Sequence, residues 1–195
     1  MPSIAKFLIT QSWIAPAAMG LIMVFSLFDP AHNAVGQHMS ELILGSSFSQ
    51  MVIRILPFLA GVSIIGFAVG VSLRGGWWSA LISVFFGTAM VSAGIVPMGS
   101  VWHGMYGLAI LSVLLPVFYC LEFEVSPAFR QLSFAISLLG LVYMWFLLVG
   151  LDPSDYRGLT QRSHAALSFG WFILASRTYK NALANKAALI SPKGM

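Results

Sequence analysis

The side chains of this chain that could do chemistry gather in a few polar segments between long apolar runs. Two of the four histidines, His32 and His38, stand in one polar stretch, and the other two stand at the beginning of apolar runs. A neutral imidazole can bind a metal ion, accept a proton or hydrogen-bond a ligand. The candidate binding cluster is Ser40, Glu41, His103, Gln161 and Arg162, followed by His38, His164, Asp155 and Arg157.

One interpretation of this cluster is a membrane-embedded hydrolase or lipid-modifying enzyme. His38, His103 and His164 are candidate zinc ligands, because three imidazoles with an open position activate a bound water. Glu41 or Asp155 would then be the fourth ligand or the general base. The chain contains neither His-Glu-x-x-His nor His-x-x-x-His, so these ligands would come from separate segments.

Two further interpretations also involve chemistry. Ser40 is a candidate nucleophile with a histidine as its base. His103 and His164 are candidate axial ligands of haem b in an electron-transfer protein, because both are expected at the same depth near one end of their helices. No second histidine pair follows deeper in these segments to carry an electron across the membrane.

The alternative without chemistry is binding. Arg162, Gln161 and His103 would hold a polar or lipid head group, because a guanidinium suits phosphate and carboxylate oxygens. Closely related is a structural role, in which Glu41 pairs with Arg162 and the cluster fastens a long loop to the helix ends. The charged end of Arg162 can alternatively extend to water, or it can pair with Asp152 or Asp155 in place of Glu41. Membrane lipid is the expected partner in the binding interpretation.

The composition places these residues at a membrane. Of the 195 residues, 58% are hydrophobic and 8% are charged, whereas a soluble domain has about 25% charged residues. This excludes a soluble domain and a disordered chain. The net charge of +4 is the balance of 10 Lys and Arg residues against 6 Asp and Glu residues. The basic residues are spread along the chain, so no basic patch favours nucleic acid as a partner. The single cysteine, Cys120, can form no internal disulfide.

Six apolar segments predict an all-α, six-helix transmembrane bundle that forms one domain. Crossing the hydrocarbon takes about 20 mostly apolar residues in a helix. Strands are excluded because a strand edge in lipid would leave backbone groups unpaired. The predicted helices run over approximately residues 8–28, 55–73, 77–96, 103–121, 132–151 and 159–176.

The distribution of Lys and Arg predicts that both termini are cytoplasmic. With six helices, Arg54, Arg157 and Arg162 share the side opposite the termini. Seven basic residues share the side of the termini, including a basic tail over residues 177–195. The long polar first loop and all four histidines then face away from the cytoplasm. The seven basic residues are Lys6, Arg74, Arg130, Arg177, Lys180, Lys186 and Lys193.

Four short motifs occur in an order that resembles a known membrane family. They are Phe28-Asp29-Pro30, Ser40-Glu41-Leu42, Val96-Pro97 and Gly158-Leu159-Thr160-Gln161-Arg162. This order resembles the bacterial and archaeal family called domain of unknown function 998, over approximately residues 28–177. The resemblance implies six helices in a bacterial or archaeal cell membrane and favours a role connected with lipid. Family members usually carry an acid soon after the proline of the third loop, and the absence of one in Met98-Gly99-Ser100 disfavours a metal site there.

Overall fold

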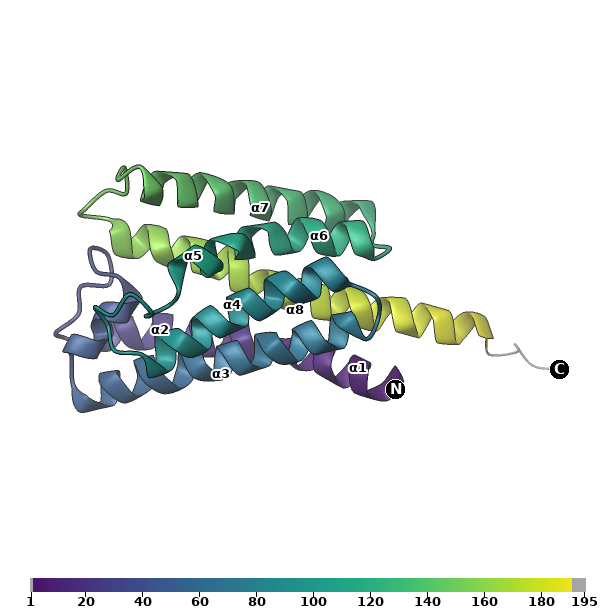
Figure 1. Cartoon of the computed structure of the whole chain (residues 1–195), viewed down its shortest axis with the longest axis horizontal. Helices are drawn as coiled ribbons and strands as arrows, with labels where there is room; N and C mark the ends of the chain where they lie inside the picture. Colours follow the sequence, from purple (N-terminus) through teal and green to yellow (C-terminus); the bar gives the residue numbers. More distant parts are fainter. Residues whose placement is uncertain (1, 191–195) are drawn as a thin grey trace.

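The computed structural model describes residues 2–190, with side chains except at positions 2, 106 and 181–190. Over these residues the backbone consists of helices and connecting loops, and no strand occurs in the described part of the chain (Figure 1). The predicted all-α class is therefore confirmed for this part of the chain. The long helices run roughly along one axis, so the molecule has two ends at which the loops gather.

The first helical stretch is interrupted by one tight turn. It comprises α1 (Pro2–Thr10), the 3₁₀ turn η1 (Gln11–Trp13) and α2 (Ile14–Phe28). The interruption lies just before Pro16, which has no N–H to donate to the carbonyl four residues earlier. The Ser12 hydroxyl donates to the Ile9 carbonyl at 2.7 Å, so this polar side chain is satisfied inside the helix.

α3 (Ser47–Ser72) and α4 (Trp77–Ile95) form a closely packed hairpin. A β-carbon at Gly61 would lie 2.5 Å from the Gly87 carbonyl oxygen, so these two backbones are in direct contact. α3 begins eight residues before the predicted start at 55, because Ser46 provides an N-cap. Its hydroxyl accepts the Ser49 N–H at 3.2 Å and satisfies a backbone donor that the helix leaves free.

The predicted helix over residues 103–121 is wrong as a single regular helix. The segment begins at residue 106 and consists of α5 (Tyr106–Ala109), the 3₁₀ segment η3 (Ile110–Leu114) and α6 (Leu115–Glu122). Gly104 at φ 67° and Met105 at φ 38° reverse the chain just before it. Pro116 gives a physical reason for the 3₁₀ segment, because it cannot donate to the Ser112 carbonyl as a regular α-helix requires.

α7 (Pro127–Leu148) and α8 (Arg157–Ile190) complete the helical elements, together with the short 3₁₀ helix η2 (Met39–Leu44) in the first loop. α8 continues well beyond the predicted end at 176, so much of the predicted tail is helical. Residues 191–195 of that tail lie outside the described residues. With 34 residues, α8 is about 50 Å long at 1.5 Å per residue.

Four helical stretches of the described chain are long and apolar enough to cross a membrane. They are Ser3–Phe28, Ser47–Ser72, Trp77–Ile95 and Pro127–Leu148, and Gly107–Glu122 is a shorter apolar stretch.

An aromatic cluster packs between the helices, where the Phe67 ring centroid lies 5.2 Å from that of Phe172 and 6.1 Å from that of Tyr119.

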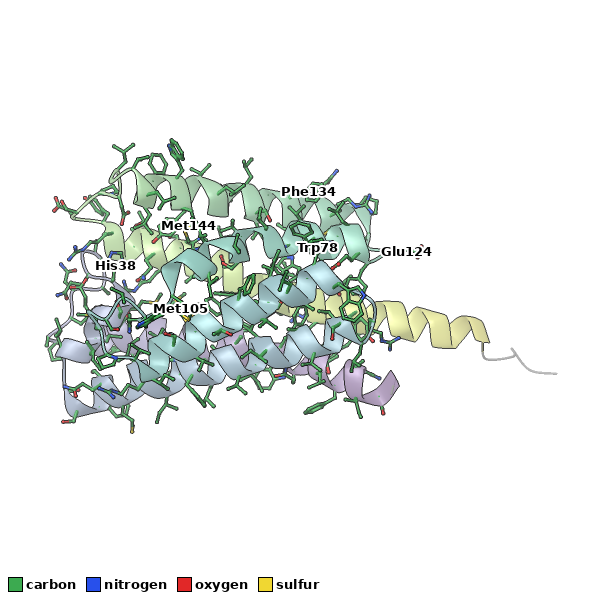
Figure 2. All side chains as sticks on the ribbon, viewed as in Figure 1. His38, Trp78, Met105, Glu124, Phe134 and Met144 are labelled. Atoms are coloured by element: carbon green, nitrogen blue, oxygen red, sulfur yellow. The ribbon has the colours of Figure 1, made fainter. Side chains whose placement is uncertain are left out.

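The two ends of the molecule differ in their loops. The beginning of α1 and the C-terminal part of α8 lie at one end, which we call the terminus end (Figure 1). The first loop, the connection after α4 and the connection after α7 lie at the opposite end, which we call the loop end. His38 lies at the loop end, whereas Trp78 and Glu124 lie toward the terminus end (Figure 2).

Candidate functional site

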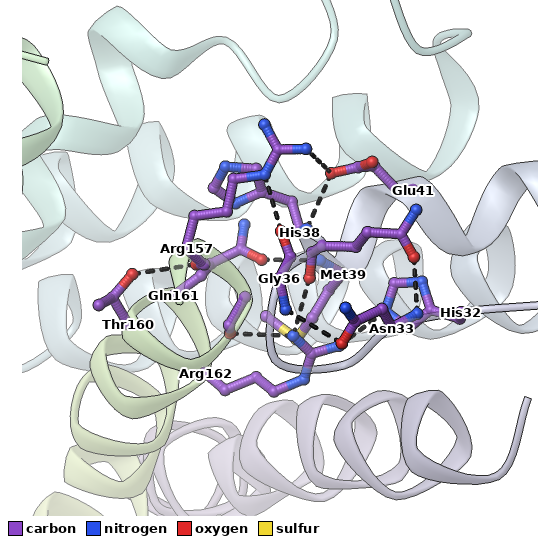
Figure 3. A network of polar contacts seen from close by, with 12 residues as sticks. His32, Asn33, Gly36, His38, Met39, Glu41, Arg157, Thr160, Gln161 and Arg162 are labelled. Atoms are coloured by element: carbon purple, nitrogen blue, oxygen red, sulfur yellow. Dashed lines mark hydrogen bonds and ion pairs between the residues drawn. The ribbon is translucent and has the colours of Figure 1, made fainter. Parts of the chain in front are cut away.

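At the loop end, the first loop is fastened to the beginning of α8 by side chains of that helix (Figure 3). Arg157 donates through Nε to the Gly36 carbonyl at 2.8 Å, and its Nη2 lies 3.4 Å from the Glu41 carboxylate. The Gln161 amide oxygen accepts the Met39 N–H at 2.7 Å. We call these contacts, together with those of Arg162 described next, the loop clip.

Arg162 lies at the centre of the loop clip and is only 8% exposed. Its Nε donates to the Ser26 hydroxyl of α2 at 3.2 Å. Its Nη1 donates to the carbonyls of Gln37 at 3.0 Å and Gly158 at 2.9 Å, and its Nη2 lies 2.9 Å from Nε2 of His32. One guanidinium therefore ties together the first loop, α2 and α8.

The predicted pair between Glu41 and Arg162 is wrong, because the partner of Glu41 is Arg157. Arg157 is the first residue of α8 and is half exposed, so it contacts the loop on its solvent-accessible side. Arg162 stands five residues further along α8 and reaches inward to Ser26 on α2. Its burial also contradicts the expectation that its charged end extends to water.

Gly158 allows the loop to lie directly on α8. A β-carbon at this position would overlap the carbonyl oxygen of Gln37 and would lie 2.6 Å from that of Ala34. The Leu159 N–H donates to the Val35 carbonyl at 3.0 Å, which uses one of the free donors at the start of a helix. A larger residue at 158 would push the loop away from the arginines that hold it.

His32 is neutral in this arrangement. The Arg162 guanidinium can only donate, so Nε2 of His32 is the acceptor of their hydrogen bond. Burial and then the positive charge of Arg162 lower the pKa of His32, while Asp29 and Glu41 act in the opposite direction. Protonation of His32 would remove this acceptor and place a second positive charge beside Arg162.

Asp29 shapes the beginning of the first loop. Its Oδ1 accepts the Ala31 N–H at 2.9 Å, which forms a turn around Pro30, and its Oδ2 accepts the Ser49 hydroxyl. These hydrogen bonds, the one from Ser49 first, lower the pKa of the Asp29 carboxyl. Asp29 therefore connects the end of α2 to the beginning of α3 and serves the geometry of the loop.

Two other predicted residues lie at the edge of the loop clip. The His38 N–H donates to Glu41 Oε1 at 2.9 Å, and His38 Nδ1 is buried without a hydrogen-bond partner among the described residues. Asp155 is exposed and accepts from the Ser154 hydroxyl at 3.2 Å. It lines an open polar depression together with His32 and makes no ion pair within the part of the chain that the structure describes.

Behind η2 lie two adjoining cavities of about 210 Å³ and about 150 Å³. Ser40, Ile53, Ala93 and His103 line both of them. Most of the remaining wall is apolar, and it comes from α2, α3, α4, α5, η2 and the connection between α4 and α5. Gln161 lines the smaller cavity. We call the two cavities together the Ser40–His103 pocket; it is where the structure brings together three of the predicted site residues.

The polar groups of the Ser40–His103 pocket keep capacity for a ligand. His103 Nδ1 lies 2.8 Å from the Val96 carbonyl, which can only accept, so Nδ1 carries the proton and Nε2 is available as an acceptor. The Gln161 oxygen is taken by Met39, so its amide nitrogen is available as a donor. The Ser40 hydroxyl makes no hydrogen bond to any described residue. The pocket therefore offers both donors and an acceptor between apolar walls.

His164 lies away from the pocket. Its ring stacks on Tyr143 of α7 at a centroid distance of 4.5 Å, and its Nε2 lies 3.4 Å from the Ser168 hydroxyl. Among residues 2–190, no group of three or more His, Cys, Asp or Glu side chains is placed to hold a metal ion. The candidate zinc ligands His38, His103 and His164 are thus not brought together, and the two candidate haem ligands have separate surroundings.

Several partners in the site carry little signal in the sequence. Every residue has a backbone carbonyl, so nothing in the sequence marks those of Gly36 and Gln37 as acceptors for arginine. Ser26 is a small polar residue within an apolar helix, and its nearness to Arg162 depends on how α2 packs on α8. His32 stands in the predicted polar loop, but only its contact with Arg162 distinguishes it from the other histidines.

Comparison of the chain with protein-family models, with curated proteins and with solved structures finds no match. The structure nevertheless gives physical roles to residues of all four motifs: Asp29 of the first shapes the start of the loop, and the Val96 carbonyl of the third contacts His103. In the last motif, Gly158 admits the loop, and Gln161 and Arg162 bind its backbone. In the second motif, Glu41 pairs with Arg157 while Ser40 faces the pocket.

Proposed function

We propose that the chain is a multi-pass membrane protein that binds a polar or lipid head group in the Ser40–His103 pocket. The observation that carries this proposal is the pocket itself, in which apolar walls surround an available hydroxyl, an amide nitrogen and an imidazole nitrogen. Ligand sites commonly combine apolar walls with a few such polar groups. The partner we expect is a membrane lipid.

We also propose six membrane crossings with both termini in the cytoplasm. Four stretches have the length and apolar composition required, and the stretches of α5–α6 and α8 would provide the other two. The beginning of α8 is polar, but Arg162 is buried and hydrogen-bonded, which lowers the cost of placing it within a membrane. In Figure 1 the beginning of α1 and the C-terminal part of α8 lie at the same end of the molecule, as an even number of crossings requires.

The structural role of the loop clip is compatible with ligand binding in the Ser40–His103 pocket. Glu41, Arg157 and Arg162 are used in fastening the loop, so a structural role accounts for them. Ser40 and His103 take no part in that fastening. Because the clip holds η2 over the cavities, it positions Ser40 in the wall of the pocket.

A second candidate is hydrolysis of a lipid ester in the same pocket. Ser40 and His103 line both cavities, and the Val96 carbonyl leaves His103 Nε2 available as a base. The Ser40 oxygen would attack the ester carbonyl while His103 takes its proton, and the acyl C–O bond would break as the alcohol leaves with that proton. Water, activated by His103, would then attack the acyl-serine, release the fatty acid and restore the Ser40 hydroxyl. Binding without turnover predicts that lipid incubated with the protein is recovered unchanged. Hydrolysis predicts release of fatty acid that Ser40→Ala abolishes.

The binding proposal is tested by measuring lipid that purifies with the protein. The chain is expected to retain about one lipid molecule in mild detergent, as counted by native mass spectrometry. Ala93→Phe fills the space that both cavities share and should remove this lipid. Ala135→Phe, on the exposed face of α7, is the matched control and should retain it. Equal retention by both variants, or none by the unmodified chain, contradicts the proposal.

A further inference from the structure

Arg54 differs from the other two arginines of the loop end. Arg157 pairs with Glu41, and Arg162 is fully engaged with the loop and neighbouring helices. The Arg54 side chain is exposed, and it forms no hydrogen bond or ion pair with any residue that the structure describes. Charged side chains within apolar spans usually have a partner, so an arginine without one is a candidate for ligand binding.

Arg54 stands where the larger cavity of the pocket meets the surface. It lines that cavity together with Ser40 and His103, while most of the other lining residues are apolar. It lies seven residues into α3, about 10 Å from the start of that helix. No Asp or Glu lines either cavity in the described part of the chain. A positive charge therefore stands at the opening of an apolar space, and no acid of the cavity walls neutralises it.

The smaller cavity lies further inside the molecule and is mainly apolar. Its walls include Met19, Ile22, Met39 and Met90. Methionine side chains adapt their shape to fill or release space, which suits a flexible hydrocarbon chain. An apolar cavity of about 150 Å³ is the size that accepts a molecule such as benzene. The space therefore suits part of one hydrocarbon chain and is too small for two.

We propose that the Ser40–His103 pocket takes an anionic amphiphile with a single hydrocarbon chain, whose acidic head group pairs with Arg54. Carboxylate and phosphate monoester oxygens both match the paired donors of a guanidinium. The Ser40 hydroxyl can donate to the same head group. The hydrocarbon chain passes His103 and enters the methionine-lined cavity. This inference rests on the proposed function, because it specifies the ligand of the same pocket.

The test compares three probes with the same ten-carbon chain: decanoate, decyl phosphate and decanol. Binding to the purified full-length chain in mild detergent is followed by native mass spectrometry titration. At least one of the two anions is expected to bind one-to-one and at least tenfold more tightly than decanol. The tighter of the two anions identifies the head group as a carboxylate or a phosphate.

Arg54→Gln should reduce the affinity for the preferred anion at least tenfold and leave that for decanol unchanged. Arg130→Gln, an exposed arginine on α7, is the matched control and should change neither. A smaller loss of anion affinity in Arg54→Gln overturns the inference, as does an anion preference over decanol of less than tenfold. If all three bind equally and Ala93→Phe blocks them, the proposed pocket stands and only its charge preference fails. If none of the three binds while Ala93→Phe still removes the lipid that the unmodified chain retains, the inference fails and the proposed pocket stands.

Discussion

At the two ends of the molecule, side chains of opposite charge bind the backbone of a segment that is distant in the sequence. At the terminus end, the Glu122 carboxylate accepts the N–H of Trp78 at 2.7 Å and that of Ser79 at 2.9 Å. These donors are the free N–H groups at the start of α4. At the loop end, Arg157 and Arg162 instead donate to carbonyls of the first loop.

The difference follows from which backbone groups are left free at each end. A helix start presents N–H groups and a partial positive charge, which a carboxylate stabilises. An irregular loop presents carbonyls, which a guanidinium can bind several at a time. The connections at the terminus end are short, and a single acid serves the start of α4. At the loop end, two arginines hold a long segment over a cavity. The hydrogen bonds that satisfy the loop carbonyls therefore also hold one wall of the pocket in place.

The largest effect is expected from removing the central cation of the loop clip. Arg162→Met should lower the free energy of unfolding by about 3 kcal/mol, because it leaves buried oxygens without donors. Hydrogen exchange of the amides from Val35 to Met39 should accelerate. Denaturant unfolding in mixed micelles measures the first effect, and exchange followed by mass spectrometry measures the second.

Arg157→Gln is the control for this prediction. Its side chain is 42% exposed, so the loss of its pair with Glu41 should cost less than about 1 kcal/mol. Equal destabilisation by the two variants would contradict the view that Arg162 is the centre of the loop clip.

A smaller and local effect is expected at the terminus end. Glu122→Gln keeps an acceptor but removes the negative charge at the start of α4, which should cost about 1 kcal/mol. Amides at the start of α4 should exchange faster, while those of the first loop stay unchanged. Glu124→Gln alters an exposed acid two residues away and should have no measurable effect. Faster exchange in the first loop of Glu122→Gln would show that the two ends are not independent.

The smallest effect is expected from His32 alone, whose share of the pH dependence of stability arises at the loop end. The pKa of His32 lies below its ordinary value of 6.5, first because of burial and then because of Arg162. The unfolded chain therefore takes up a proton at a pH where the folded chain does not. Stability falls as the pH drops through about 6.5 and stops falling below the pKa of the folded state. His32→Gln should reduce the difference in unfolding midpoint between pH 7.5 and pH 5, and an unchanged difference would contradict this assignment.

The sequence predicts some parts of the candidate site better than others. The polar segments between apolar runs predict Ser40, His103 and Gln161 as site residues, and all three line the Ser40–His103 pocket. The predicted partner of Glu41 is the wrong arginine, because charge complementarity alone does not distinguish Arg157 from Arg162. The position of His164 near the start of the last apolar run predicts that it belongs to the site, but its ring stacks on Tyr143.

The helices too are predicted in part: their apolar lengths are, whereas some of their ends and breaks are not. The α3–α4 hairpin and α7 were predicted from apolar length, whereas the start of α3 depended on the cap at Ser46. The segment over residues 103–121 has apolar residues throughout, so its length alone predicts one helix. Its break depends on backbone hydrogen bonds that Pro116 cannot make.

By itself, the sequence determined the all-helical class, the apolar stretches and the presence of a polar loop, because these depend on composition and local hydrogen bonding. The tertiary structure alone decided that Arg162 is buried, that Arg157 pairs with Glu41 and that Arg54 has no partner among the described residues. The physical reason is that distant segments must pack together before a given carbonyl comes within reach of a side chain, before a cavity forms and before one side of a helix is buried. The type of a charged residue determines which interactions it can form, and the tertiary structure determines which partners lie within its reach.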